Sequence, residues 1–114
     1  MTLQEIIDEL NLEVLTTKRD FYQLVPSAGY ASDLLSCVIA GANRKGLWIT
    51  LQAHNNIVAV AALLEISAVI ITEDARPDEQ TIARANEEGV TLLSTDKSTF
   101  YIAGKLWEAG LRER

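Results

Sequence analysis

From residue 47 onward, short apolar runs alternate with helical patterns of about ten residues. The mainly apolar runs cover residues 47–52, 68–72 and 90–95. The helical patterns fill residues 57–65, residues 77–88 and a last segment that ends at Gly110. Strands that are apolar on both sides need cover on both sides, which a parallel sheet between two helical layers provides. The sequence therefore predicts a three-layer α/β fold with a mostly parallel sheet and helices on both faces.

The first 46 residues continue this pattern with weaker signals. Thr2 and Glu5 form a capping box, which predicts a helix over residues 3–10. The run "LEVLTT", residues 12–17, is typical of a strand, and a second extended stretch is expected around Pro26. Residues 34–42 then have a helical pattern. No linker divides the chain, so we expect a single domain over residues 1–114.

Polar residues at the starts of the expected helices indicate how each one begins. Ser32 or Asp33 is a candidate cap for helix 34–42, and Asp96 or Thr95 for the last helix. Pro77 is expected at the first helical position of residues 77–88, and Gly89 ends that helix.

Charge and hydropathy exclude several classes of partner. The 114 residues contain 10 basic and 16 acidic side chains, a net charge of −6, which disfavours binding to nucleic acid or to anionic lipid. No apolar run reaches the ~18 residues of a membrane span, and the start "MTLQEIIDEL" lacks the basic and then apolar order of a secretory signal. We expect a cytoplasmic protein that binds neither nucleic acid nor membrane.

Motifs for metals and for nucleotide cofactors are missing. The chain has one histidine and one cysteine, without the paired spacing of a metal site, and it has neither a P-loop nor a Gly-x-Gly-x-x-Gly motif. We expect no metal, no cofactor and no P-loop phosphoryl transfer. Cys37 lies in the apolar segment "DLLSCVIAGA" and is predicted to be buried and inert. Trp48 and Trp107 are expected in the core or in an interface.

Polar side chains are concentrated directly after the predicted strands. In a parallel sheet, ligands bind beyond the carboxyl ends of the strands, where these loops meet. We therefore predict a ligand-binding edge formed by Ser32, Asp33, Gln52, His54, Asn55, Asn56, Thr72, Glu73, Asp74, Thr95 and Asp96. Glu73 and Asp74, beside Arg76, fit either a solvated loop or a site for a cation or an amine.

His54 has three possible roles. Together with Asn55 and Asn56 it can cap helix 57–65, with its ring bonded to a backbone carbonyl. It can contact a ligand. It can also act as a general acid or base if the fold brings Asp33, Glu73 or Asp96 close enough to orient the ring.

Four segments of the chain resemble a known family. They are "WIT", "HNNIVAVA", "AVIIT" with the acidic helix after it, and "LLSTDKSTF". In this order they resemble the DRTGG domain and the related N-terminal domain of bacterial HPr kinase/phosphorylase. The family's Asp-Arg-like pair and Thr-Gly-Gly are replaced here by His54-Asn55-Asn56 and Thr72-Glu73-Asp74. Two acids in place of glycines prevent close backbone approach and add negative charge, both unfavourable for a bound phosphate.

The resemblance implies a non-catalytic regulatory or ligand-sensing α/β module, which often dimerises. We accordingly expect a homodimer that binds a small molecule, such as a nucleotide-like compound, or a protein partner at the loop edge. Two other functions compete with this one. The first is a small enzyme that uses His54, and the second is a scaffold whose only activity is dimerisation.

Overall fold

The computed structural model describes residues 1–113 and contains five helices, one 3₁₀ helix and five strands within that range. In chain order the elements are α1 (Leu3–Leu10), β1 (Glu13–Val14), the 3₁₀ helix η1 (Phe21–Gln23), β2 (Gly29–Ala31), α2 (Leu35–Gly41), β3 (Leu47–Thr50), α3 (Asn56–Leu63), β4 (Ala68–Ile71), α4 (Glu79–Glu88), β5 (Leu92–Ser94) and α5 (Thr99–Glu108).

All five strands form one sheet in the order β1-β5-β4-β3-β2. The four strands β2 to β5 run parallel, with Ile49 beside Ile70 and Ile70 beside Leu93. Strand β1 is antiparallel to β5. The prediction of a mostly parallel sheet is confirmed.

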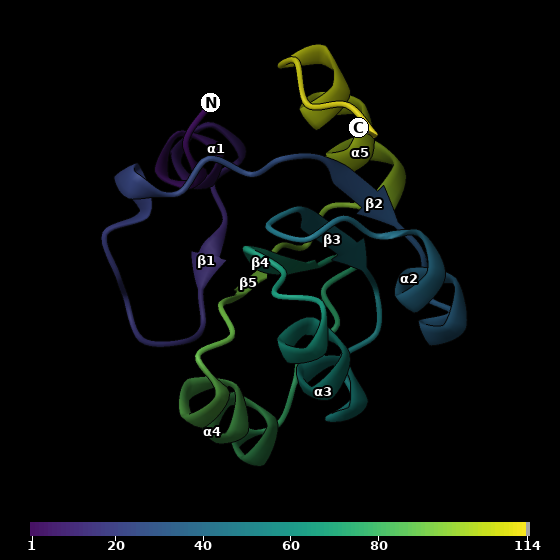
Figure 1. Ribbon diagram of the computed structural model, residues 1–114. Coiled ribbons are helices and arrows are strands. Elements are labelled where there is room, and N and C mark those ends of the chain that lie inside the picture. The colour runs from purple at the N-terminus through teal and green to yellow at the C-terminus, as the bar shows by residue number, and fades with distance from the viewer. Residues whose placement is uncertain (114) are drawn as a thin grey trace.

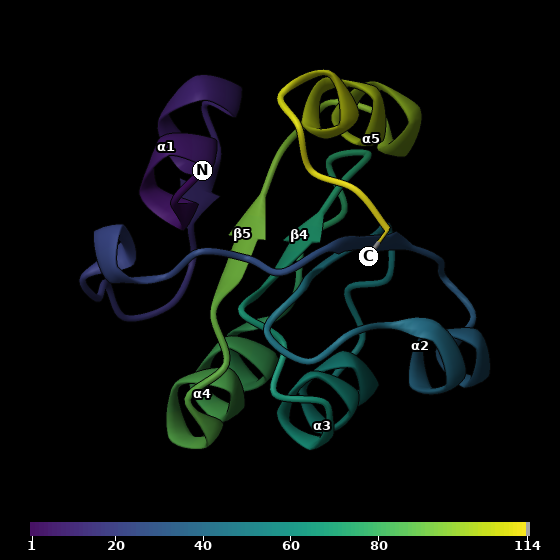
Figure 2. The same ribbon diagram turned by 45° about the horizontal axis from the view of Figure 1, so that its top comes forward.

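Helices cover both faces of this sheet, as Figures 1 and 2 show. Helices α1 and α5 lie on one face, and α2, α3 and α4 lie on the other. Every residue of β3, β4 and β5 is buried, because alternate side chains enter the two separate cores. Ile49, Ile70 and Leu93 pack with α1 and α5, whereas Trp48 and Val69 belong to the core under α2, α3 and α4. The predicted three-layer arrangement is confirmed.

The capping box of α1 forms as predicted, but α4 starts later than expected. Thr2 accepts the N–H of Glu5, whose carboxylate accepts the N–H of Thr2. Helix α4 begins at Glu79 because the carboxylate of Asp78 accepts the N–H of Thr81 at 2.8 Å. Pro77 therefore precedes the cap and is not the first helical residue, since aspartate satisfies the free N–H groups that proline cannot.

The predicted caps of α2 and α5 were wrong. Helix α5 is capped by Ser98, whose hydroxyl accepts the N–H of Tyr101, and not by Asp96 or Thr95. Helix α2 has no side-chain cap bond. Ser32 instead accepts the N–H of Leu34, in the turn before the helix. The carboxylate of Asp33 is directed toward the end of β3.

Strand β1 is shorter than the run "LEVLTT" suggested. Only Glu13 and Val14 pair regularly with β5. Beyond them, Leu15 donates its N–H to the carbonyl of Leu92, and Thr16 accepts the N–H of Leu92 through its hydroxyl. Single bonds of this kind hold residues 15–16 beside β5 without a continuous ladder.

The sequence predictions for Trp48, Cys37 and Trp107 have different outcomes. Trp48 is fully buried, as expected of a core residue. Cys37 is exposed, so the prediction of a buried thiol was wrong. Helix α2 consists mostly of apolar residues, but the only residue it buries is Val38, and Cys37 is left exposed. Trp107 of α5 is half exposed and does not belong to the core.

Candidate ligand-binding rim

Four loops meet at the carboxyl edge of the parallel sheet. Strands β2, β3, β4 and β5 end at Ala31, Thr50, Ile71 and Ser94, and their register places these ends side by side. We call the loops beyond them the rim, which comprises residues 32–33, 50–56, 72–76 and 95–99.

Asp33 joins the first two loops of the rim. Its Oδ1 accepts the hydroxyl of Thr50 and the backbone N–H of Leu51, both at 2.8 Å. The side-chain amide of Gln52 donates to the carbonyl of Asp33 at 3.3 Å. The loop after β2 is thereby fixed to the end of β3, and the predicted residues Asp33 and Gln52 are in contact.

A chain of three threonine groups links the middle of the rim to α5. The hydroxyl of Thr72, which is fully buried, donates to the carbonyl of Thr50 at 3.3 Å. Its oxygen also lies 2.6 Å from the hydroxyl of Thr99, which is left as the donor of that bond. Thr50 and Thr99 were missed as site residues. Thr50 could have been found from the sequence. The apolar runs "WIT" and "AVIIT" both end in threonine, and the second of these, Thr72, was predicted as a site residue.

Glu73 and Asp74 follow β4 in a left-handed conformation. Their φ angles are 61° and 58°, values that glycine adopts readily and other residues rarely. The N–H of Glu73 donates to the carbonyl of Lys97, and the N–H of Asp74 donates to the carbonyl of Thr95. These bonds fix the loop to the one after β5, so the acids take a backbone path suited to two glycines.

The carboxylate of Glu73 lies at the start of α5. It accepts the backbone N–H of Thr99 at 2.9 Å. The first N–H groups of a helix are unpaired within it and carry partial positive charge, so they attract anions. In this chain the carboxylate of Glu73 occupies the place that a bound anion would take at the start of α5.

His54 ends the loop after β3 and caps α3 in an unexpected way. Its Nδ1 accepts the N–H of Asn56 at 3.1 Å, so the ring bonds a backbone donor and not a carbonyl. Asn55 occupies the cap position without a side-chain cap bond. Its carbonyl oxygen accepts the guanidinium of Arg84 on α4 at 3.1 Å. The contacts of His54, Asn55 and Asn56 are therefore with α3 and α4.

An acid–base role for His54 requires a carboxylate that orients its ring. Among residues 1–113, no carboxylate is hydrogen-bonded to the exposed imidazole. Asp33 and Glu73 are bonded to other groups, and Asp96 is exposed. The geometry does not supply the oriented imidazole that this hypothesis requires.

Asp78, which caps α4, is expected to make the stability of the protein depend on pH. Its pKa lies below the ordinary value, chiefly because the N–H of Thr81 bonds its carboxylate, with a smaller attraction from His54. A lowered pKa in the folded state stabilises the protein fully above the unfolded pKa of about 4, and this contribution is lost as the pH falls through the folded pKa. Asp78→Asn keeps a capping oxygen but cannot titrate. In urea denaturation, the wild type should therefore lose more stability than this variant between neutral pH and about pH 3, and equal losses would contradict the prediction.

The remaining charged residues of the rim are exposed. Arg76 contacts Glu13 at 3.0 Å and Asp74 at 3.5 Å, and the bond to Glu13 is the main cause that raises its pKa. In the described part of the chain, no three His, Cys, Asp or Glu side chains are grouped so that they could hold a metal ion. Within residues 1–113, no helix is both long and apolar enough to cross a membrane.

Comparison with known proteins places this fold. A comparison with curated proteins finds no match. Among solved structures, the chain is similar to the CBS and DRTGG domains of the regulatory region of Clostridium perfringens pyrophosphatase, complexed with the activator diadenosine tetraphosphate. The TM-score is 0.73 at 18% identity, over 90% of this chain and 44% of the other, so the likeness shows the fold alone. The DRTGG domain family matches residues 33–109, and the chain belongs to this family.

Proposed function

We propose that this chain is a non-catalytic regulatory module that binds a small ligand at the rim. The observation that carries the proposal is the hydrogen-bonded continuity of the rim from Asp33 through Thr50 and Thr72 to Thr99 and Glu73. These groups come from separate loops, and polar groups so arranged at the carboxyl edge of a parallel sheet are well placed to recognise a ligand. Membership of the DRTGG family and a structural relative crystallised with an activator support the regulatory role.

The charges of the rim restrict the class of ligand. A phosphate that approaches the start of α5 must displace the carboxylate of Glu73 from the N–H of Thr99. Asp74, which also pairs with Arg76 at 3.5 Å, and Asp96 add exposed negative charge to the rim. We therefore propose a small polar ligand that offers hydrogen-bond donors or positive charge to the rim, and we expect phosphate-bearing nucleotides to bind weakly.

Native mass spectrometry combined with thermal shift tests this function. We expect purified wild-type protein to retain a small molecule from the cell, or to be stabilised by a member of a panel of polyamines and more weakly by adenine nucleotides. A ligand at one hundred times its Kd adds about 2.7 kcal/mol of stability. Asp33→Asn and Thr72→Val alter the rim and should lose the effect, whereas Glu9→Gln on α1 should keep it. Stabilisation that all variants share equally would contradict a site at the rim.

Two finer proposals accompany this function. We propose kinship with the N-terminal domain of HPr kinase/phosphorylase, supported by the segments "HNNIVAVA" and "LLSTDKSTF". We also propose that the chain forms a homodimer, supported by the exposed aromatic side chains of α5.

A further inference from the structure

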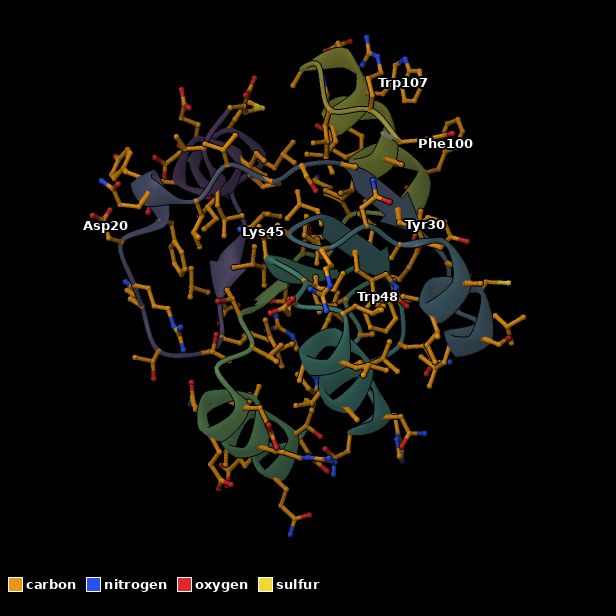
Figure 3. The ribbon with its side chains drawn as sticks, in the orientation of Figure 1. Asp20, Tyr30, Lys45, Trp48, Phe100 and Trp107 are labelled. Carbon is orange, nitrogen blue, oxygen red and sulfur yellow. The ribbon has the colours of Figure 1, made fainter. Side chains whose placement is uncertain are left out.

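A hollow of about 560 Å³ lies between α5 and β2, at the edge of the sheet opposite β1. It exists because the residues of β2 that face α5 are Gly29 and Ala31, whose partners in β3 belong to the core under that helix. Their side chains are too small to fill the space below α5. Figure 3 shows Trp107 on α5 and Tyr30 on β2, both of which border the hollow.

The wall of the hollow is largely apolar. The buried side chains of Ile49 and Leu106 line it, together with Ala103 and Leu111. Leu111 approaches β2 so closely that a Cβ atom at Gly29 would lie 3.0 Å from its side chain. Pockets that hold small molecules have volumes of about 300–1,000 Å³ and mostly apolar walls with a few polar groups. The hollow matches this description in size and in the composition of its wall.

Arg112 holds a cation in a fixed position beside the hollow. Its guanidinium lies 4.4 Å from the centre of the Trp107 ring, and its Nη1 donates to the carbonyls of Trp107 and Leu111. The carbonyl of Arg112 accepts the N–H of Gly29 at 2.8 Å, which ties this residue to β2. Within residues 1–113 its Nε and Nη2 have no hydrogen-bond partner, and no carboxylate pairs with it. These donors are free to bind a carboxylate.

The edge of β2 supplies another donor. Ser32 donates its N–H to the carbonyl of Ile49 in β3, so the N–H of the preceding residue, Ala31, faces away from β3. Gly29, which faces the same way, donates to Arg112. The N–H of Ala31 has no corresponding backbone partner in the described part of the chain. The hollow is therefore bordered by polar donors as well as by apolar side chains.

We propose that this hollow is a second binding site, which takes a carboxylate with an apolar body, as in a short fatty acid. The apolar body lies against Ile49, Ala103 and Leu106, and the carboxylate accepts hydrogen bonds from Arg112. Glu113 is the one acid that borders the hollow, and it opposes the bound carboxylate. The inference does not depend on the ligand of the rim, because no rim residue lines the hollow.

Isothermal titration calorimetry of the full chain with butanoate, hexanoate and octanoate tests the site. Each methylene that enters the hollow should lower the dissociation constant by up to about fourfold. Octanamide has the same apolar body without the charge, so it should bind at least about tenfold more weakly than octanoate. The net charge of the chain is −6, which repels the carboxylate, so a preference for octanoate reports a local cation.

Substitutions locate the site within the molecule. Ala103→Phe fills the hollow from α5 and retains Arg112, so it should weaken octanoate binding at least about tenfold without lowering the melting temperature. Arg112→Gln should abolish the preference for octanoate over octanamide, and Glu113→Gln should strengthen octanoate binding. Lys18→Gln is the matched control, because it removes an exposed cation after β1, at the other edge of the sheet. It should leave the dissociation constant unchanged.

Three results would overturn the inference. They are octanoate that binds no better than butanoate or not at all, octanamide that binds as tightly as octanoate, and an Ala103→Phe variant that binds octanoate as the wild type does. Thr72→Val, which alters the rim, should not affect octanoate binding. A rim that binds nothing therefore leaves these titrations unchanged, and an empty hollow leaves ligand binding at the rim intact.

Discussion

Replacing Glu73 and Asp74 together by glycine is expected to raise the affinity of the rim for phosphate-bearing ligands at least about tenfold. The change removes two negative charges and frees the N–H of Thr99, which the Glu73 carboxylate occupies at 2.9 Å. A hydrogen bond to a charged group contributes about 1.5–3 kcal/mol, and each 1.4 kcal/mol corresponds to a tenfold change in affinity. Calorimetric titration with inorganic pyrophosphate and with diadenosine tetraphosphate measures the gain.

Alanine at the same two positions is the matched control. It removes the same charges but retains a Cβ atom at φ angles of 61° and 58°. The left-handed conformation costs a residue other than glycine about 1–2 kcal/mol, so the alanine variant should melt at a lower temperature than the glycine variant. If the wild type binds pyrophosphate as tightly as the glycine variant does, Glu73 does not exclude anions and this reading of the rim is wrong.

The central strands of the sheet could be predicted because a strand that is buried on both faces consists almost entirely of apolar residues. All four residues of β3 and of β4 are buried, so both strands appear as continuous apolar runs. Strand β1 lies at the edge of the sheet with two paired residues, and nothing in "LEVLTT" distinguishes those two from the rest. Side chains of helices that consist mostly of apolar residues were harder to place. The sequence of α2 does not show which stripe meets the sheet, and Cys37 was therefore misplaced.

The rim was predictable as a place but not as a set of contacts. Parallel strands end at one edge whatever their sequence, so Asp33, Gln52 and Glu73 were expected to lie close together, and hydrogen bonds connect them to neighbouring loops. The bond between Thr72 and Thr99 joins residues 27 positions apart, and it depends on how α5 leaves β5. No local sequence pattern predicts a contact between residues so far apart in the chain. The direction of an exposed ring such as that of His54 is equally unspecified by sequence.

Trp48→Ala is expected to destabilise the fold by about 3–5 kcal/mol, the cost of removing a large aromatic side chain from a packed core. Trp48 is fully buried between β3 and the helices on one face. Its indole N–H also donates to the carbonyl of Ser32 at 2.9 Å, directly before Asp33. The substitution therefore removes core packing and a contact that holds the first loop of the rim.

Trp48→Phe separates these two contributions. Phenylalanine retains most of the apolar contact but cannot donate a hydrogen bond, so the carbonyl of Ser32 loses its partner at a cost of about 1–3 kcal/mol. Urea denaturation followed by far-ultraviolet circular dichroism measures both variants without relying on tryptophan emission. If the two variants are equally stable, packing is not the main contribution of this side chain. If Trp48→Phe is as stable as the wild type but loses ligand binding at the rim, the indole N–H serves to position the loop that carries Asp33, and stability and recognition are separable at this one residue.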